Sequence, residues 1–331
     1  MNLREQACWL LLVFESGLSV RIVNSILALW GKQQGRSLQD FFAADVQEWR
    51  TICNIGDDIV EKLEQAREKQ VAQAFLAEQL QYDHIQVITV LDPVYPVSLK
   101  RTLGLSQLPP MLFVAGDLNV LQRQTIALIG ARKAAKESLA FATMAAHYLV
   151  TQGGNVVSGY ARGVDYAAYE GAISAGGYTT AVLPHGIRKL SKAQLRELHP
   201  HIESGKVLVL SQFHPAAPWQ MSRAMERNNV VTALAHIVIV AESDKKGGTW
   251  EGANEALKQQ RPLYVRSAEA GTSLPGNLLL IAKGGQPLPW PIEQAEQVFA
   301  PLLKESTILF HKQQEASDPP TKLALKSRTP G

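Results

Sequence analysis

The stretch TIALIGARKAAKESLAFATMAAHYLVTQGGNVVSGYARGVD, residues 125–165, decides the fold class. It begins with a strand pattern over 125–130, because the residues there are apolar almost without interruption. Residues 136–152 carry apolar side chains at helical spacing, and 155–158 form a second short apolar run. Continuous apolar strands that alternate with helices are typical of a parallel sheet covered on both faces. The stretch therefore predicts two parallel strands joined by a helix.

The same alternation continues to residue 266. We predict further helices at 164–175, 190–203, 222–235 and 247–259, and further strands at 178–184, 206–211, 236–242 and 261–266. This order predicts an α/β fold, an open, doubly wound, mostly parallel sheet of Rossmann type. In such sheets the ligand site lies beyond the carboxyl ends of the strands, so the loops at those ends are the first candidates for function.

The rest of the chain differs in character. Apolar residues recur at helical spacing through residues 1–84, which predicts a small all-α domain of about four or five helices. Two short strand patterns follow, separated by prolines, and they open a Rossmann-like domain that we place at 85–290. Residues 291–331 are predicted to be a short tail that is partly disordered, and its polar part begins near residue 304.

Composition excludes several classes of protein. The 331 residues carry 33 Lys and Arg against 30 Asp and Glu, so the formal charge of +3 excludes a histone-like polycation. Two cysteines cannot build a disulfide framework, and no ligand pattern indicates zinc, so we expect a cytoplasmic protein without a metal ion or cofactor. The apolar run at 7–14 ends at Glu15, which favours a buried helix over a signal peptide or membrane span.

The loop after the first strand of the quoted stretch is suited to phosphate. Gly130 lets the backbone approach an anion, while Arg132 and Lys133 supply positive charge just before a helix. Neither G-x-G-x-x-G nor the Walker pattern is present. A tight turn whose basic side chains are merely solvated is the alternative interpretation.

The loop after the next strand has the same character. Ser158, Gly159, Arg162 and Gly163 precede a helix whose first turn contains Asp165. Asp165 is expected to cap that helix or to fasten the loop by accepting backbone N–H groups. No His or Asp partner activates Ser158 as a nucleophile, so we expect no catalytic residue.

Two further candidates complete one edge of the sheet. Arg227 and Asn228 offer side chains suited to phosphate or base-edge contacts, although a polar surface helix would also contain them. Gly247, Gly248 and Thr249 form another glycine-rich turn between a strand and a helix. A hairpin pattern at 52–60 in the helical domain is less suited to DNA, because Asp57 and Asp58 would repel a phosphate.

The order of these motifs resembles the DprA (Smf) family of bacterial DNA-processing proteins over roughly residues 90–290. The matching segments are Tyr95-Pro96 with Leu99, LPPMLFVAG at 108–116, Gly130-Ala131-Arg132, 158–165, 227–231, 247–249, and 274–277 with Gly284-Gly285. The resemblance implies a homodimer that binds single-stranded DNA through its Rossmann-like domain. It also implies help in loading the RecA recombinase during DNA uptake, phosphate contacts from Arg132, Lys133 and Arg227, and an N-terminal domain similar to sterile-alpha-motif modules.

The chain departs from the family pattern at several positions. Ala131 replaces a serine, Tyr169 a histidine, and Asn229 an arginine, which removes one charge-assisted phosphate contact. We also do not expect the winged helix that many members carry, because roughly 40 residues after Pro291 are too few for one.

Three functions remain open on the sequence alone. The first is a non-enzymatic binder of single-stranded DNA, in which a ring such as Tyr160 stacks on bases. The second is a nucleotide sensor or nucleotide phosphoribohydrolase of the wider superfamily, with phage defence as one setting, in which Glu251 acts on the ribose. The third is a dimeric adaptor with little DNA affinity. The sequence gives neither the biological setting nor the dimer and partner surfaces.

Overall fold

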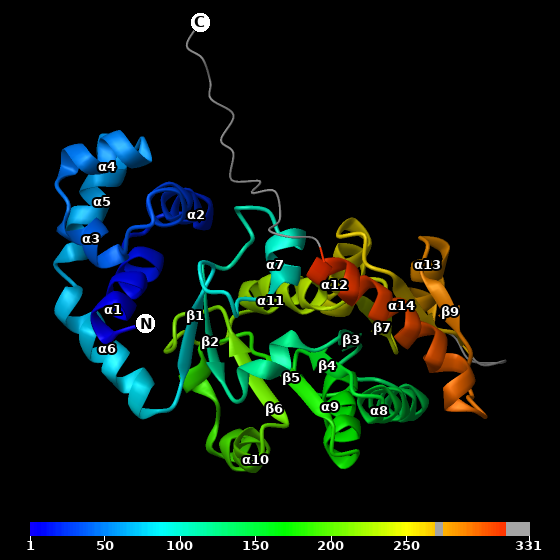
Figure 1. Cartoon of the computed structure of the whole chain (residues 1–331). Coiled ribbons are helices and arrows are strands. Elements are labelled where there is room, and N and C mark those ends of the chain that lie inside the picture. The colour runs from blue at the N-terminus through cyan, green and yellow to red at the C-terminus, as the bar shows by residue number, and fades with distance from the viewer. Residues whose placement is uncertain (269–273, 316–331) are drawn as a thin grey trace, which may run out of the picture. The chain divides into compact units, whose positions relative to one another are not determined.

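A computed structural model describes residues 1–268 and 274–315 (Figure 1). The chain divides into two compact units. The first contains Met1–Tyr95 and Leu103–Phe113, and the second contains Pro96–Thr102 and the described residues from Val114 onward. Among the described residues, no helix combines the length and apolar character needed to cross a membrane.

The first unit is helical up to Tyr82, and it also contains strand β1 (Gln86–Thr89). Its helices are α1 (Leu3–Leu10), α2 (Val20–Ile26), α3 (Leu38–Ala43), α4 (Val46–Cys53), α5 (Asp57–Arg67) and α6 (Gln70–Tyr82), with π-helical turns η1 (Leu11–Glu15) and η2 (Leu27–Gln33).

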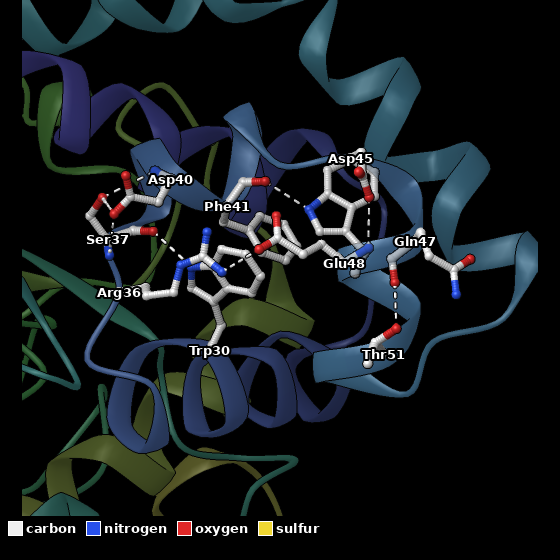
Figure 2. Close-up of polar contacts among 10 residues, drawn as sticks. Trp30, Arg36, Ser37, Asp40, Phe41, Asp45, Gln47, Glu48 and Thr51 are labelled. Carbon is white, nitrogen blue, oxygen red and sulfur yellow. Dashed lines mark hydrogen bonds and ion pairs between the residues drawn. The ribbon is translucent and has the colours of Figure 1, made fainter.

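Polar contacts fix the ends of these helices around an aromatic core. Ser37 and Asp40 form a reciprocal capping box at the start of α3 (Figure 2). The Arg36 guanidinium lies 3.9 Å from the centre of the buried Trp30 ring and pairs with Glu48. Packing of this kind, with large rings shielded by short polar links, stabilises a small helical unit.

The hairpin at 52–60 serves helix packing. Helix α4 ends where Asn54 takes a left-handed conformation, and Gly56 precedes α5. Asp57 pairs with Arg50 across the turn, so one of the two carboxylates expected to repel DNA contributes to a local ion pair. This geometry agrees with the structural interpretation of the pattern.

The second unit is the predicted α/β fold. Its strands are β3 (Thr125–Ile129), β4 (Asn155–Ser158), β5 (Tyr178–Val182), β6 (Val207–Ser211), β7 (Ile237–Val240), β8 (Leu263–Arg266) and β9 (Gln286–Leu288), while β2 (Met111–Ala115) lies where the two units meet in sequence. They pair in parallel in the order β6-β5-β4-β3-β7-β8-β9. The doubly wound α/β prediction is therefore confirmed.

Helices cover both faces of this sheet. The helices are α7 (Val97–Thr102), α8 (Lys136–Thr151), α9 (Val164–Ser174), α10 (Lys192–Glu203), α11 (Met221–Leu234), α12 (Gly248–Lys258), α13 (Pro275–Ala282) and α14 (Ala295–Glu315), with short η3 (Leu118–Gln122) and η4 (Ile187–Lys189). Helices α8, α9 and α10 lie on one face, and α11 and α12 lie on the other (Figure 1).

The strand order creates a switch point between β3 and β7. From β3 the chain winds outward through β4, β5 and β6, and it then returns to place β7 on the other side of β3. The loops that leave β3 and β7 consequently diverge to opposite faces, which opens a crevice at the carboxyl end of the sheet.

The segment predicted as a tail departs from that expectation. Residues 304–315 belong to α14, whose Phe299 and Leu302 are buried in the same apolar cluster as Phe141 of α8. Tyr264 also bonds to Glu305, so the helix is tied to the sheet by polar as well as apolar contacts. Burial of these side chains stabilises helix over a stretch that looks polar in sequence. Residues 316–331 lie outside the described part.

Candidate functional site

A cavity of about 520 Å³ lies at the switch point, formed by the loops that leave β3, β4 and β7 and by the start of α11. Ten of the thirteen predicted site residues line it: Gly130, Arg132, Lys133, Gly159, Asp165, Arg227, Asn228, Gly247, Gly248 and Thr249. The remaining three, Ser158, Arg162 and Gly163, do not line the cavity. The fold thus gathers three loops and one helix, which are up to about 120 residues apart in the chain, into one site.

Asp165 fastens the loops of this site. It is buried in the first turn of α9 and accepts the N–H of Gly159 at 3.1 Å, with further backbone bonds from Gly130 and Ala161. Burial raises the pKa of this carboxyl, while the nearby Arg227 charge and the three N–H groups oppose that shift. Its place inside the loops makes Asp165 a structural residue.

Two glycines of the β4 loop leave no room for a side chain, because neighbouring groups approach their backbone closely. A Cβ atom at Gly159 would lie 2.4 Å from the Arg227 guanidinium, and one at Gly163 would lie 2.3 Å from the carbonyl oxygen of Ala131. Gly163 also has a φ of +85°, which side chains rarely adopt. Ser158, buried beside them, accepts the N–H of Tyr160, so its hydroxyl shapes the turn.

Arg227 is turned inward. Only 3% of it is exposed, and its guanidinium donates to the carbonyl oxygens of Gly159 and Val182 and to Asn228 Oδ1. Burial lowers the pKa of Arg227 to about 10, partly offset by Asp165. The resemblance implies a phosphate contact from Arg227, but in the structure its Nη1 donates to two backbone oxygens and its Nε to Asn228.

The exposed cations of the cavity are Arg132, Lys133 and Lys246. Within the described residues none of the three forms a salt bridge with a carboxylate. They line the same cavity as the N-terminus of α12, where Gly247 has a φ of +97° and no side chain caps the helix. Free N–H groups at a helix start, together with unpaired cations, favour a bound anion.

An apolar ledge borders these cations, and the sequence interpretation did not include it. Trp219, Met221 and Met225 line the cavity with 48%, 69% and 46% of their surface exposed. The Arg132 guanidinium carbon lies 5.9 Å from the centre of the Trp219 ring. The signal was an aromatic residue in the irregular loop before α11, next to two methionines at positions i and i+4.

Tyr160 does not serve as the predicted stacking ring. Only 9% of it is exposed, and its ring packs against Tyr166 and Tyr169 at 6.1 and 5.1 Å between centroids. Burial raises its pKa, with a further contribution from Glu197. The tyrosine that stands in place of the family's histidine, Tyr169, thus completes a packed aromatic cluster behind the loop. The exposed ring of the site is Trp219.

This arrangement defines the class of protein: a Rossmann-type α/β domain, joined to a small helical unit, with a basic cavity and an apolar ledge at its switch point. The sequence model of the family described as DNA recombination-mediator protein A matches residues 86–300. The chain belongs to this family.

Relatives and solved structures agree with that assignment. The chain is 27% identical over 191 residues to the DNA processing protein DprA of Streptococcus pneumoniae, covering 58% of this chain and 63% of that protein. It is 29% identical over 178 residues to Protein Smf of Escherichia coli, covering 54% and 46%. These alignments span less than two thirds of either relative.

Two solved structures share the fold. The DprA structure from Streptococcus pneumoniae superposes with a TM-score of 0.69 at 22% identity, over 89% of this chain and 97% of that chain. DprA from Helicobacter pylori, whose structure is described as revealing a single-stranded DNA binding mode, gives a TM-score of 0.56 at 26% identity, over 67% and 96%.

Proposed function

We propose that this protein binds single-stranded DNA, without catalysis, at the switch-point cavity. The observation that carries the proposal is the juxtaposition of three unpaired cations, an uncapped helix start and an exposed indole in one cavity. Membership of the recombination-mediator family and the DNA-binding description of the Helicobacter pylori structure support it.

The two halves of the site suit the two halves of a nucleotide. Arg132, Lys133 and Lys246 neutralise backbone phosphates beside the N–H groups of α12. Trp219 and its neighbouring methionines offer a flat apolar surface to an unpaired base. Bases in a duplex are already stacked and paired, so this ledge favours single strands.

The finer role follows from family membership. We propose that the protein acts in the cytoplasm as a homodimer, protects single strands, and helps to load RecA recombinase during DNA uptake by natural transformation. Recovery of RecA on the immobilised protein, with and without single-stranded DNA, tests this role. Recovery independent of DNA, by a protein that itself binds no strand, would favour the adaptor function instead.

Fluorescence anisotropy with a labelled oligonucleotide tests DNA binding directly. Single strands should bind more tightly than a duplex of the same length, and Arg132→Ala should weaken binding while the exposed Arg4→Ala should not. For about three phosphates, affinity should fall roughly 20-fold between 50 and 200 mM salt. Equal binding by the wild type and Arg132→Ala at both salt concentrations would refute the proposed site.

One observation keeps a second function under consideration. Glu251 lies in the first turn of α12 and lines the same cavity. Its carboxylate could accept hydrogen bonds from the hydroxyl groups of a ribose there. We therefore retain a nucleotide sensor or nucleotide phosphoribohydrolase as the second candidate. Release of free base from nucleoside monophosphates by the wild type, abolished by Glu251→Gln, would replace the DNA-binding proposal with the enzymatic one.

A further inference from the structure

Glu242, which follows β7, is bonded to both ends of the loop that carries Arg132 and Lys133. Its carbonyl oxygen accepts the N–H of Ala131 at 2.9 Å. Its carboxylate oxygen Oε2 accepts the N–H of Ala135 at 2.9 Å and the hydroxyl of Ser138 at 2.5 Å. One residue of β7's exit loop thus fixes the path of the neighbouring β3 loop.

A buried arginine orients this contact. The Arg266 guanidinium donates to the Ser138 hydroxyl at 2.5 Å, and both side chains are buried. Because Ser138 accepts from Arg266, its own proton is directed to Glu242. Ser138 of α8 therefore bonds the Glu242 carboxylate directly, and Arg266 of β8 orients that serine.

The position of this carboxylate has an electrostatic consequence. Helix α8 follows the strand at the switch point, and the N-terminus of that helix is where doubly wound folds commonly hold a phosphate. Glu242 places a fixed negative charge at this start, because its carboxylate accepts the N–H of the N-cap residue Ala135 and the hydroxyl of Ser138 in the first turn. A phosphate there would meet that charge at close range, and repulsion between like charges at such distances is strong.

Helix α12 offers the contrasting case. Its first residues, from Gly248, have no side-chain cap, and Gly247, Gly248 and Thr249 all line the cavity. Its own acidic residue in the first turn, Glu251, accepts no bond from these N–H groups in the described structure. The start of α8 therefore carries a bonded carboxylate, whereas the start of α12, which lines the cavity, carries none.

We propose that Glu242 is a positioning residue that excludes phosphate from the start of α8 and directs it to the start of α12. This inference rests on the proposed binding of a nucleic-acid phosphate in the cavity. It makes Glu242 a determinant of where the strand lies, in addition to its role in holding Arg132 and Lys133.

Titration with inorganic phosphate, followed by amide NMR, tests the proposal without DNA. In the wild type, phosphate should shift the amide signals of Gly248 and Thr249 and leave those of Ala135 and Lys136 unmoved. Wild-type shifts at the α8 amides would overturn the proposal, and this part of the experiment needs no variant to fold.

Glu242→Gln keeps an oxygen that can accept both hydrogen bonds but removes the charge. It should allow phosphate to shift the α8 amides as well, and it should steepen the logarithmic salt slope of single-strand binding by about 0.7, one added phosphate. Glu137→Gln is the matched control, because it removes a charge from the first turn of the same helix. Equal effects of the two variants, or no effect of Glu242→Gln, would overturn the specific role of Glu242.

The experiment separates this inference from the function on which it rests. If phosphate perturbs only the α12 amides but no single strand binds, the proposed function fails while the assignment of Glu242 stands. If strands bind and Arg132→Ala weakens them, yet phosphate perturbs α8 in the wild type, the assignment fails and the function stands.

Discussion

The guanidinium of Arg227 donates to the carbonyl oxygen of Gly159 at 2.5 Å, while the carboxylate of Asp165 accepts the N–H of the same glycine at 3.1 Å. Both polar groups of one peptide residue are thus held by buried charges from two helices, α11 and α9. This clamp keeps the β4 loop at the wall of the cavity. Arg227 lines the cavity, and the same contacts give it a structural role within the protein.

Substitution of Arg227 should therefore affect the free energy of unfolding more than the affinity for DNA. Arg227→Met leaves two backbone carbonyls unpaired and the buried Asp165 without its compensating charge. We expect the free energy of unfolding in urea to fall by about 3–5 kcal/mol. Arg132→Met, at an exposed position, should change it by less than about 0.5 kcal/mol. A stable Arg227→Met protein that has lost DNA affinity would identify Arg227 as a direct phosphate ligand.

Two Gly→Ala variants can show how much the close approach of the β3 and β4 loops contributes to stability. Gly163 and Gly153 both have a φ of +85°, but a Cβ atom at Gly163 would lie 2.3 Å from a carbonyl oxygen, whereas one at Gly153 meets nothing within 4 Å. Substitution by alanine at Gly153 should cost about 1–2 kcal/mol of unfolding free energy, the left-handed strain alone.

Alanine at Gly163 should cost clearly more than that and should also lower single-strand affinity, because the backbone of Ala131 and Arg132 must move. Thermal unfolding and anisotropy of the two variants provide the comparison. Equal losses of stability would show that strain, and not contact with the β3 loop, makes glycine necessary at residue 163.

The fold could be predicted from sequence because each apolar run in 125–266 has the length of a strand and each intervening segment has helical periodicity. That alternation fixes a parallel, doubly wound sheet and places the glycine-rich loops at one edge. The gathering of Gly130, Gly159 and Gly247 at one cavity then follows from the order of the strands.

Other features depend on pairings that no local pattern reveals. The contact of Glu242 with Ala135 exists because β7 lies next to β3, and nothing in the sequence around Glu242 indicates that neighbour. Trp219 belongs to an irregular loop without periodicity. Helix α14 contains Pro301 and many polar residues, so its intrinsic helix propensity is low. The helix forms because Phe299 and Leu302 are buried in the same apolar cluster as residues of α8.

His236 should make stability depend on pH. Burial lowers the pKa of its imidazole to about 4, and its Nδ1 lies 3.1 Å from the backbone nitrogen of Thr125. An unfolded histidine has a pKa near 6.5, so the unfolded chain binds more protons between pH 4 and 6.5. The contribution is fully present above pH 6.5 and is lost as the pH falls to about 4, a change of about 3 kcal/mol.

Urea unfolding at several pH values measures this contribution. The slope of unfolding free energy against pH between 6.5 and 4 should be smaller for His236→Gln than for the wild type. His147→Gln, at an exposed position of α8, should keep the wild-type slope. An unchanged slope for His236→Gln would mean that other groups cause the loss of stability in acid.

Trp219 should contribute to binding and hardly at all to stability. Its indole is 48% exposed beside Arg132, so truncation removes little buried surface but takes away the largest flat ring of the cavity. Trp219→Ala should weaken single-strand binding by about 1–3 kcal/mol, and Trp219→Phe should recover part of that loss because a smaller ring still stacks. Duplex affinity should change little. Leu278→Ala, which removes a similarly exposed apolar side chain from α13, outside the cavity, provides the control. If Trp219→Ala left the preference for single strands unchanged, phosphate contacts alone would account for binding and the ledge would need another role.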